Sequence, residues 1–126
     1  MNFPAAIPEL PVRNVEEAAA YYVQKLGFTS DWGDEAGGIG GISRQDCRVF
    51  LTNSEFRAAN GNAGLMVIWL NLSSKAEVDA LHAEWKSKGA TILLEPEDKP
   101  WKLREFTAAD PDGNRIRVFY DFRGDA

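Results

Sequence analysis

Few side chains in this chain of 126 residues are suited to catalysis. The single histidine, His82, lies in an expected helix, where a lone histidine is more often a packing or surface residue than a metal ligand. The single cysteine, Cys47, lies in an expected strand with no histidine nearby in the sequence, so we interpret it as a structural thiol. The glycine-rich residues 37–41 lack the Lys-Ser/Thr that completes a phosphate-binding loop. No catalytic residue is therefore assigned.

Four tryptophans offer binding chemistry instead. Trp69 and Trp85 fit core positions of a strand and a helix, and we expect them to be structural. Trp32 and Trp101 adjoin acidic loops and are expected at the rim of a cleft, although packing between subunits would explain them equally well. Aromatic walls stack on flat rings and attract cations, each contact contributing on the order of 0.5–2 kcal/mol. The sequence therefore favours binding over catalysis.

The charge balance excludes one class of partner. The formal net charge is −5, and lysines and arginines are scattered without a basic block, which disfavours nucleic-acid binding. Acidic residues adjoin the two rim tryptophans and would attract a cationic ligand, although solubility alone would also explain an acidic surface. These acidic residues are Asp31, Asp34, Glu35, Glu97 and Asp98.

The first half of the chain predicts a helix between extended segments. Prolines keep residues 5–12 extended. Asn14 and Glu17 have the spacing of a capping box, apolar residues follow at helical spacing, and Gly27 is typical of a helix end. Strands are expected at residues 28–32, 38–43 and 47–52. The order is therefore β-α-β-β-β.

The second half repeats this order. A strand is expected at residues 65–72, a helix from the Ser74–Glu77 capping box to Gly89, and strands at 91–94, 103–108 and 116–122. Residues 95–100 are expected to form a loop, and residues 110–113 a tight turn. The polar residues 55–64 are interpreted as the connection. We thus predict one α+β domain, 1–126, with βαβββ modules at about 1–57 and 63–126.

No segment is expected to span a membrane or to act as a signal peptide. The longest apolar run has the length of a strand, and the N-terminus lacks the basic and apolar regions of a signal peptide. One cysteine cannot form an internal disulfide, so the expected location is the reducing cytoplasm.

Several segments resemble the vicinal oxygen chelate superfamily, which includes glyoxalase I, extradiol dioxygenases, and fosfomycin- and bleomycin-resistance proteins. They are Pro-Val-Arg-Asn-Val at 11–15, Tyr-Tyr at 21–22, Leu-Gly-Phe at 26–28 and Asp-Pro-Asp-Gly-Asn at 110–114. The resemblance implies paired βαβββ modules with pseudo-twofold symmetry that form half-open barrel sheets. Within the superfamily, Leu-His-Ala-Glu-Trp at 81–85 and Trp-Lys-Leu-Arg-Glu-Phe at 101–106 are most similar to bleomycin-resistance proteins.

The same resemblance implies where metal ligands of the superfamily's enzymes would stand. Those positions fall on Ile7, Val67 and Arg117, none of which binds a cation, so no metal and no cofactor is expected. The implied function is sequestration of a cationic aromatic ligand, such as a bleomycin-type antibiotic, by a homodimer with exchanged N-terminal strands. The residues expected to bind it are Trp32, Phe50, Asn62, Trp101, Asp31 and Asp34.

Two other functions stay open. One is a lyase or dioxygenase of the same superfamily with a non-standard metal site. The other is a carrier or interaction module whose natural ligand is unrelated to bleomycin.

Overall fold

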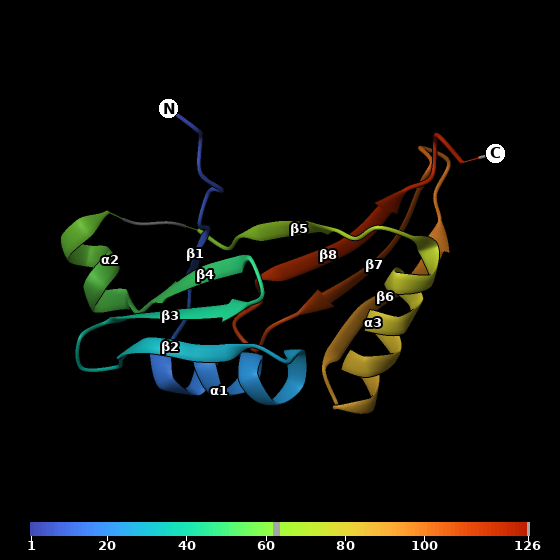
Figure 1. Ribbon diagram of the computed structural model, residues 1–126. Coiled ribbons are helices and arrows are strands. Elements are labelled where there is room, and N and C mark those ends of the chain that lie inside the picture. The colour runs from blue at the N-terminus through green and yellow to red at the C-terminus, as the bar shows by residue number, and fades with distance from the viewer. Residues whose placement is uncertain (62–63, 126) are drawn as a thin grey trace. The chain divides into compact units, whose positions relative to one another are not determined.

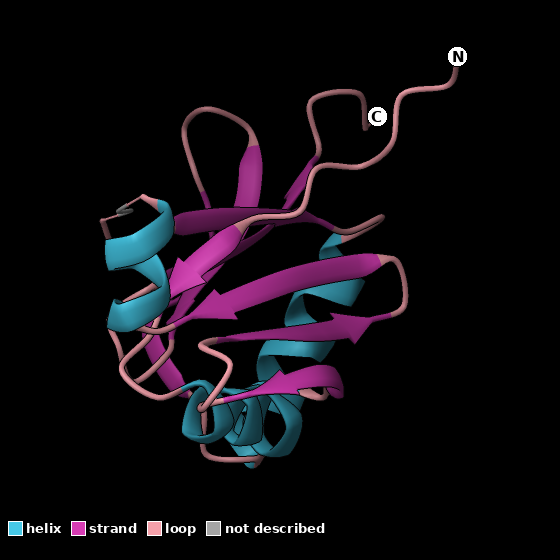
Figure 2. Ribbon diagram, turned by 90° about the vertical axis from the view of Figure 1, so that its left-hand side faces the viewer, coloured by secondary structure: helices cyan, strands magenta, loops and turns pink. Residues whose placement is uncertain are grey.

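The computed structural model describes residues 1–61 and 64–125, and the chain divides into two compact units, Met1–Met66 and Val67–Ala126. Each unit contains one four-stranded sheet with a long helix on one of its faces (Figures 1 and 2). The predicted α+β class with two βαβββ modules is confirmed. Whether both units form one domain stays a prediction.

The first unit has the strand order β1-β4-β3-β2, with β1 parallel to β4 and the other neighbours antiparallel. A second, short helix follows the last strand, within the segment expected to be only a connection. The elements are β1 (Glu9–Pro11), α1 (Val15–Leu26), β2 (Thr29–Asp34), β3 (Ile39–Arg44), β4 (Cys47–Thr52) and α2 (Ser54–Asn60).

Local capping residues set the ends of α1, as predicted. The Asn14 side chain accepts a hydrogen bond of 2.9 Å from the Glu17 backbone N–H, which satisfies one of the free donors at the helix start. Gly27 ends the helix at φ 78°, in the left-handed region that glycine adopts without a Cβ clash. The helix therefore begins and ends where its sequence dictates.

The second unit repeats the pattern with the order β5-β8-β7-β6, in which β5 is parallel to β8. Ser74 caps its helix by accepting from the Glu77 N–H, and the Glu77 carboxylate accepts in return from the Ser73 N–H. The elements are β5 (Val67–Asn71), α3 (Lys75–Ser87), β6 (Thr91–Asp98), β7 (Leu103–Ala109) and β8 (Arg115–Asp121).

Each unit builds its core between its helix and one face of its sheet. In the first unit Tyr22 and Leu26 of α1 are fully buried with Ile42, Val49 and Leu51 of the strands. In the second, Val78 and Trp85 of α3 are buried with Phe106, Ile116 and Val118. We call the sheet face turned away from α1 or α3 the distal face. Because side chains alternate along a strand, the residues between these core positions lie on the distal face.

Two sequence predictions about the second unit are wrong. Residues 95–98 are strand, not loop, because Glu97 and Asp98 pair with Glu105 and Arg104 of β7, and irregularities in the ladder accommodate Pro96. Trp69 is not a core residue: its side chain is 49% exposed, since it lies on the distal face of β5. Trp85, by contrast, is a core residue as predicted, at 1% exposure.

Among the described residues, no helix is both long enough and apolar enough to span a membrane.

Candidate functional site: an aromatic distal face on each sheet

The distal face of the first sheet carries an aromatic pair. Trp32 of β2, Gly41 of β3 and Phe50 of β4 lie side by side in one cross-strand row. The rings of Trp32 and Phe50 meet edge to face, with centroids 5.2 Å apart and planes at 75°, which is a favourable aromatic geometry. Two residues that the sequence analysis chose separately are thus brought into contact.

Gly41 allows the indole to lie on the sheet between the two strands. A Cβ at position 41 would fall 2.3 Å from the Trp32 Nε1 atom and 2.5 Å from its Cε2 atom. No side chain at position 41 fits in that space, so only glycine allows the indole to lie there. Trp32 is 43% exposed, which leaves part of its ring accessible for stacking.

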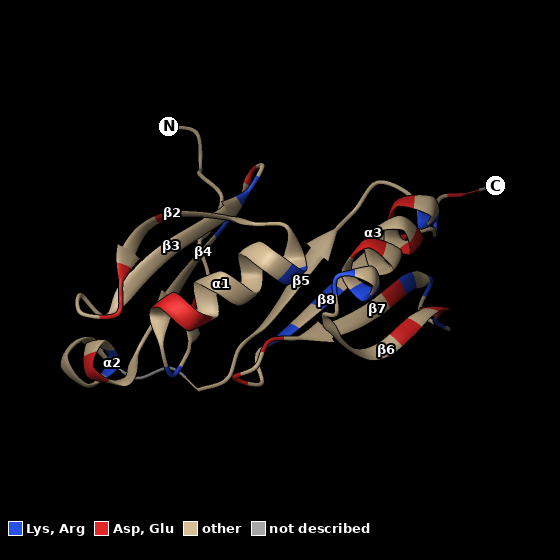
Figure 3. Ribbon diagram, turned by 90° about the horizontal axis from the view of Figure 1, so that it is seen from below, with Lys and Arg blue, Asp and Glu red and all other residues tan. Residues whose placement is uncertain are grey.

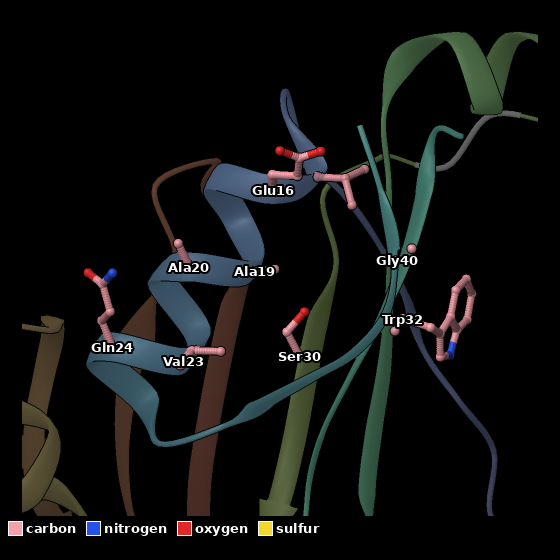
Figure 4. A pocket seen from close by; sticks show the side chains of 11 residues that line it. Glu16, Ala19, Ala20, Val23, Gln24, Ser30, Trp32 and Gly40 are labelled. Carbon is pink, nitrogen blue, oxygen red and sulfur yellow. The ribbon is translucent and has the colours of Figure 1, made fainter. Parts of the chain in front are cut away.

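A β-bulge directs Trp32 to the distal face. Ser30 pairs with Ile42 and Trp32 pairs with Gly41, so Asp31 is an extra residue in the ladder. In a regular strand, residues two apart such as Ser30 and Trp32 point to the same side of the sheet, whereas the bulge puts these two on opposite sides. Figure 4 shows the result, with Trp32 pointing away from α1. The predicted site residue Asp31 therefore positions Trp32, and its own side chain is exposed.

A hollow of about 340 Å³ lies on the other side of β2, against α1 (Figure 4). Small and apolar residues dominate its lining, including Ala19, Ala20, Val23 and Gly40, with Ser30 among the polar ones. Its polar lining residues are Glu16, Gln24 and Ser30, and the ring of Trp32 that pairs with Phe50 points away from α1, to the other face of the strand. We therefore place the candidate site on the distal face and not in this hollow.

The distal face of the second sheet carries a second aromatic pair that sequence reasoning missed. Trp69 of β5 and Phe119 of β8 meet edge to face, with centroids 5.6 Å apart and planes at 79°. The guanidinium of Arg117 lies 5.3 Å from the centre of the Trp69 ring, within range of a cation–π contact. The signal that could have found this pair is the alternation of residues 67 and 69 and of 117 and 119 on one side of adjacent strands.

Trp101 belongs to the second unit and is held by a buried carboxylate. Its indole N–H donates a hydrogen bond of 3.2 Å to Glu105 of β7, whose residue exposure is only 4%. Lys99 lies 5.9 Å from the ring centre, and Trp101 itself remains 53% exposed. Glu105, which was not predicted as a site residue, fixes the orientation of a ring that stands on a turn.

Several of the acidic residues expected near the rim tryptophans have structural roles. Asp34 accepts from the Gly37 N–H at 2.7 Å within a turn, and Glu35 accepts from the Val15 N–H at 2.7 Å at the start of α1. Asp98 pairs with Lys75 at 2.8 Å and with Arg104 at 3.1 Å. The hydrogen bond from Lys75, followed by that from Arg104, holds the pKa of Asp98 below its ordinary value.

Acidic and basic segments accordingly alternate over α3, β6 and β7 in Figure 3.

Of the remaining predicted site residues, Phe50 is half-buried on its distal face, and Asn62 lies outside the described residues.

The donor set does not fit a metal centre. Within residues 1–61 and 64–125, no three His, Cys, Asp or Glu side chains cluster so that they could hold a metal ion. Val67 and Arg117 stand on β5 and β8 with an apolar and a cationic side chain, neither of which ligates a divalent ion. His82 instead packs against Phe106, with ring centroids 5.3 Å apart, and pairs with Glu95.

Cys47 is also unsuited to catalysis. Burial raises the pKa of its thiol, which keeps the sulfur protonated near neutral pH and lowers its reactivity.

Comparisons with known proteins agree with this architecture. Residues 5–118 match the model of the Glyoxalase/Bleomycin resistance protein/Dioxygenase superfamily. The bleomycin resistance protein of Geobacillus stearothermophilus is 24% identical over 130 aligned positions, covering 94% of this chain and 97% of the relative.

Two solved structures show the range of the likeness. The bleomycin-binding protein from Streptomyces verticillus, solved with copper(II)-bleomycin, is 27% identical, with a TM-score of 0.72 over 94% of this chain and 96% of its own. Lactoylglutathione lyase from Agrobacterium tumefaciens shares the fold at 18% identity, with a TM-score of 0.75 over 92% of each chain.

The paired βαβββ modules and the match over most of the chain define the class. This protein belongs to the Glyoxalase/Bleomycin resistance protein/Dioxygenase superfamily, and its relatives include proteins named for bleomycin resistance.

Proposed function

We propose that this protein is a metal-independent binding protein that sequesters a planar aromatic small molecule in the cytoplasm. The first ligand to test is a cationic bleomycin-type antibiotic. The observation that carries the proposal is the position of the Trp32 indole, which lies against Gly41 and contacts Phe50 edge to face. Because Trp32 is held in this way and is still 43% exposed, its ring is suited to stacking on a ligand and not to bond-making chemistry.

The ligand class draws support from two sources. The curated relative is named for bleomycin resistance, and the Streptomyces verticillus structure contains copper(II)-bleomycin. The chain itself carries a formal net charge of −5, which attracts cations at long range. In this proposal Trp32 and Phe50 of the first unit stack on a ligand, with Asp31 and Asp34 as polar contacts. Trp101 of the second unit is proposed separately as a stacking residue, and Asn62 stays a predicted contact.

The test is a calorimetric titration of the protein with metal-free bleomycin and, separately, with copper-loaded bleomycin, which measures the affinity for each. Trp32→Ala and Trp101→Ala should each weaken binding by about tenfold, the scale of one lost aromatic contact. Leu93→Ala is the matched control, because Leu93 is also an exposed apolar side chain on a strand, at 42% exposure. Equal affinities for all four proteins would remove both tryptophans from the site, and absence of binding would remove this drug.

Sequestration also predicts that the ligand is recovered unchanged. Mass spectrometry of bleomycin after incubation and release should give the mass of the starting compound. A modified product, or stoichiometric metal in the purified protein with loss of function in a chelator, would favour the lyase or dioxygenase alternative.

We further propose a homodimer in which the proline-rich N-terminal strands are exchanged. Pro8 and Pro11 suit this role because β1 is an edge strand of its sheet, and proline is tolerated at sheet edges. Sedimentation velocity should give the mass of two chains. A variant that lacks residues 1–8 should shift toward the monomer, and a purely monomeric full-length protein would contradict the exchange.

A further inference from the structure

The two units carry the same tripeptide at equivalent places. Arg48-Val49-Phe50 lies in β4 and Arg117-Val118-Phe119 lies in β8. Each strand is the last one of its sheet in chain order, and each is the strand that pairs in parallel with the first. The repeat is therefore structural as well as sequential.

The tripeptide divides its side chains between the two faces of the sheet. Val49 and Val118 are fully buried in their cores, so the flanking arginine and phenylalanine lie on the distal face. Each phenylalanine meets a tryptophan edge to face, Phe50 with Trp32 and Phe119 with Trp69. Each unit thus has an aromatic pair with an arginine beside it.

Both guanidinium groups lie over aromatic rings. The Arg48 Cζ atom is 5.8 Å from the centre of the Phe50 ring, and the Arg117 Cζ atom is 5.3 Å from the centre of the Trp69 ring. A guanidinium in such a contact keeps its N–H edge available for hydrogen bonding. Arg117 is half-buried whereas Arg48 is exposed, so Arg117 is the better fixed of the two.

Neither arginine is neutralised by a carboxylate in the part of the chain that the structure describes. Arg104, by contrast, pairs with Asp79 at 2.9 Å and with Asp98 at 3.1 Å. The carboxylate nearest in register is Glu105, directly across from Phe119, and it accepts the hydrogen bond from Trp101. Arg117 therefore offers an unpaired positive charge beside two aromatic rings.

We propose that the distal face of the second unit binds a planar aromatic acid. Its carboxylate or other anionic group pairs with the Arg117 guanidinium, and its ring lies against Trp69 and Phe119. Charge complementarity selects this ligand, because guanidinium binds carboxylates through two parallel hydrogen bonds. The inference goes beyond the proposed sequestration of a cationic drug and does not depend on it.

The test uses three probes that share a naphthalene ring and carry an anionic, a neutral or a cationic substituent: 2-naphthoate, 2-naphthamide and 2-naphthylmethylammonium. Each is titrated into the full-length protein and followed by calorimetry and tryptophan fluorescence. We expect naphthoate to bind more tightly than the neutral and cationic probes. Arg117→Gln should weaken naphthoate binding by about tenfold, the scale of a charge-assisted hydrogen bond, and leave naphthamide binding unchanged.

Two variants control for net charge and geometry. Lys25→Gln removes one positive charge in the last turn of α1, in the other unit, and should leave all three affinities unchanged. Arg117→Lys keeps the charge but loses the paired donors, so it should bind naphthoate with intermediate affinity. Arg48→Gln should have a smaller effect than Arg117→Gln.

Specific results would overturn the inference. They are equal affinities for naphthoate and naphthamide, no binding of any probe, or equal losses in Arg117→Gln and Lys25→Gln. A larger loss in Arg48→Gln than in Arg117→Gln would overturn the assignment to the second unit. Bleomycin titrated in parallel separates the two proposals, since its failure to bind with naphthoate binding intact would contradict the proposed function alone.

Discussion

The indole nitrogen of Trp32 occupies the place that a Cβ of residue 41 would need. The separation would be 2.3 Å, far inside the contact distance of any two heavy atoms, so the indole and a side chain at position 41 are mutually exclusive. Gly41 thereby determines that Trp32 lies against the sheet beside Phe50.

Gly41→Ala should displace the Trp32 side chain and abolish its contact with Phe50. We expect weaker ligand binding, a red shift of tryptophan emission, and a loss of about 1–3 kcal/mol in unfolding free energy from overpacking. Gly64→Ala is the matched control, since nothing lies within 4 Å of a Cβ there. Unchanged emission in Gly41→Ala would contradict the seat described for Trp32.

Trp101→Phe keeps an aromatic ring but removes the N–H that Glu105 accepts. Because Glu105 is 4% exposed, its carboxylate would lose a donor in a site that water scarcely reaches. Urea unfolding should show a loss of about 1–3 kcal/mol, the usual effect of a missing partner for a buried polar group. Trp32→Phe is the comparison, because its indole nitrogen lies against Gly41 and not against a carboxylate. Equal losses in the two variants would argue against the anchoring role of Glu105.

Asn114→Ala should weaken the turn before β8. The Asn114 side chain donates to the Asp110 carboxylate at 2.9 Å, and its backbone N–H donates to the same carboxylate at 3.0 Å. Both residues are almost fully buried, so losing the side-chain donor should cost about 1–3 kcal/mol in thermal or urea unfolding. Asn60→Ala removes an exposed hydrogen bond to Phe56 and should change stability much less.

Acid should weaken the second unit partly through Asp98. The Lys75 and Arg104 partners hold the pKa of Asp98 below its ordinary value of 3.8, so folding favours the ionised carboxylate. This contribution is fully present above that value and is lost as pH falls through the lower pKa of the folded protein. Asp98→Asn should therefore be less stable than the parent near neutral pH, and the difference should vanish in strong acid.

Urea midpoints measured for both proteins from about pH 6 to pH 2 would check this convergence. The pair is exposed, so the difference should also shrink in high salt. A difference that persists in strong acid would show that Asp98 acts through something other than its charge.

The features predicted correctly from sequence are those that neighbouring residues determine. Asn14, Gly27 and Ser74 mark helix ends because capping depends on atoms within a turn of the helix. The length of β6 was missed because pairing of Glu97 with Glu105 is a contact between distant residues, and it outweighs the local preference of Pro96 for a loop.

In the candidate site too, features set by neighbouring residues could be predicted and features set by contacts between distant residues could not. Trp32 and Trp101 could be chosen because an aromatic residue beside an acidic turn is visible in the sequence. Trp69 was placed in the core because alternation along a strand does not say which side the helix covers. The contact of Trp32 with Phe50 could not be predicted either, since it depends on the register of β2 against β3 and on the extra residue Asp31.

The β-bulge accommodates the extra residue Asp31 while Trp32 stays on the distal face of the sheet. Deleting Asp31 would make Ser30 and Trp32 consecutive in a regular ladder, and because consecutive residues point to opposite faces, both would keep the faces that they have now. The change would fall on an edge strand and leave the buried Val49 and Leu51 of β4 in place. The edge strand thus tolerates the gain or loss of this one residue, with the aromatic pair on the distal face and the buried positions of β4 both preserved.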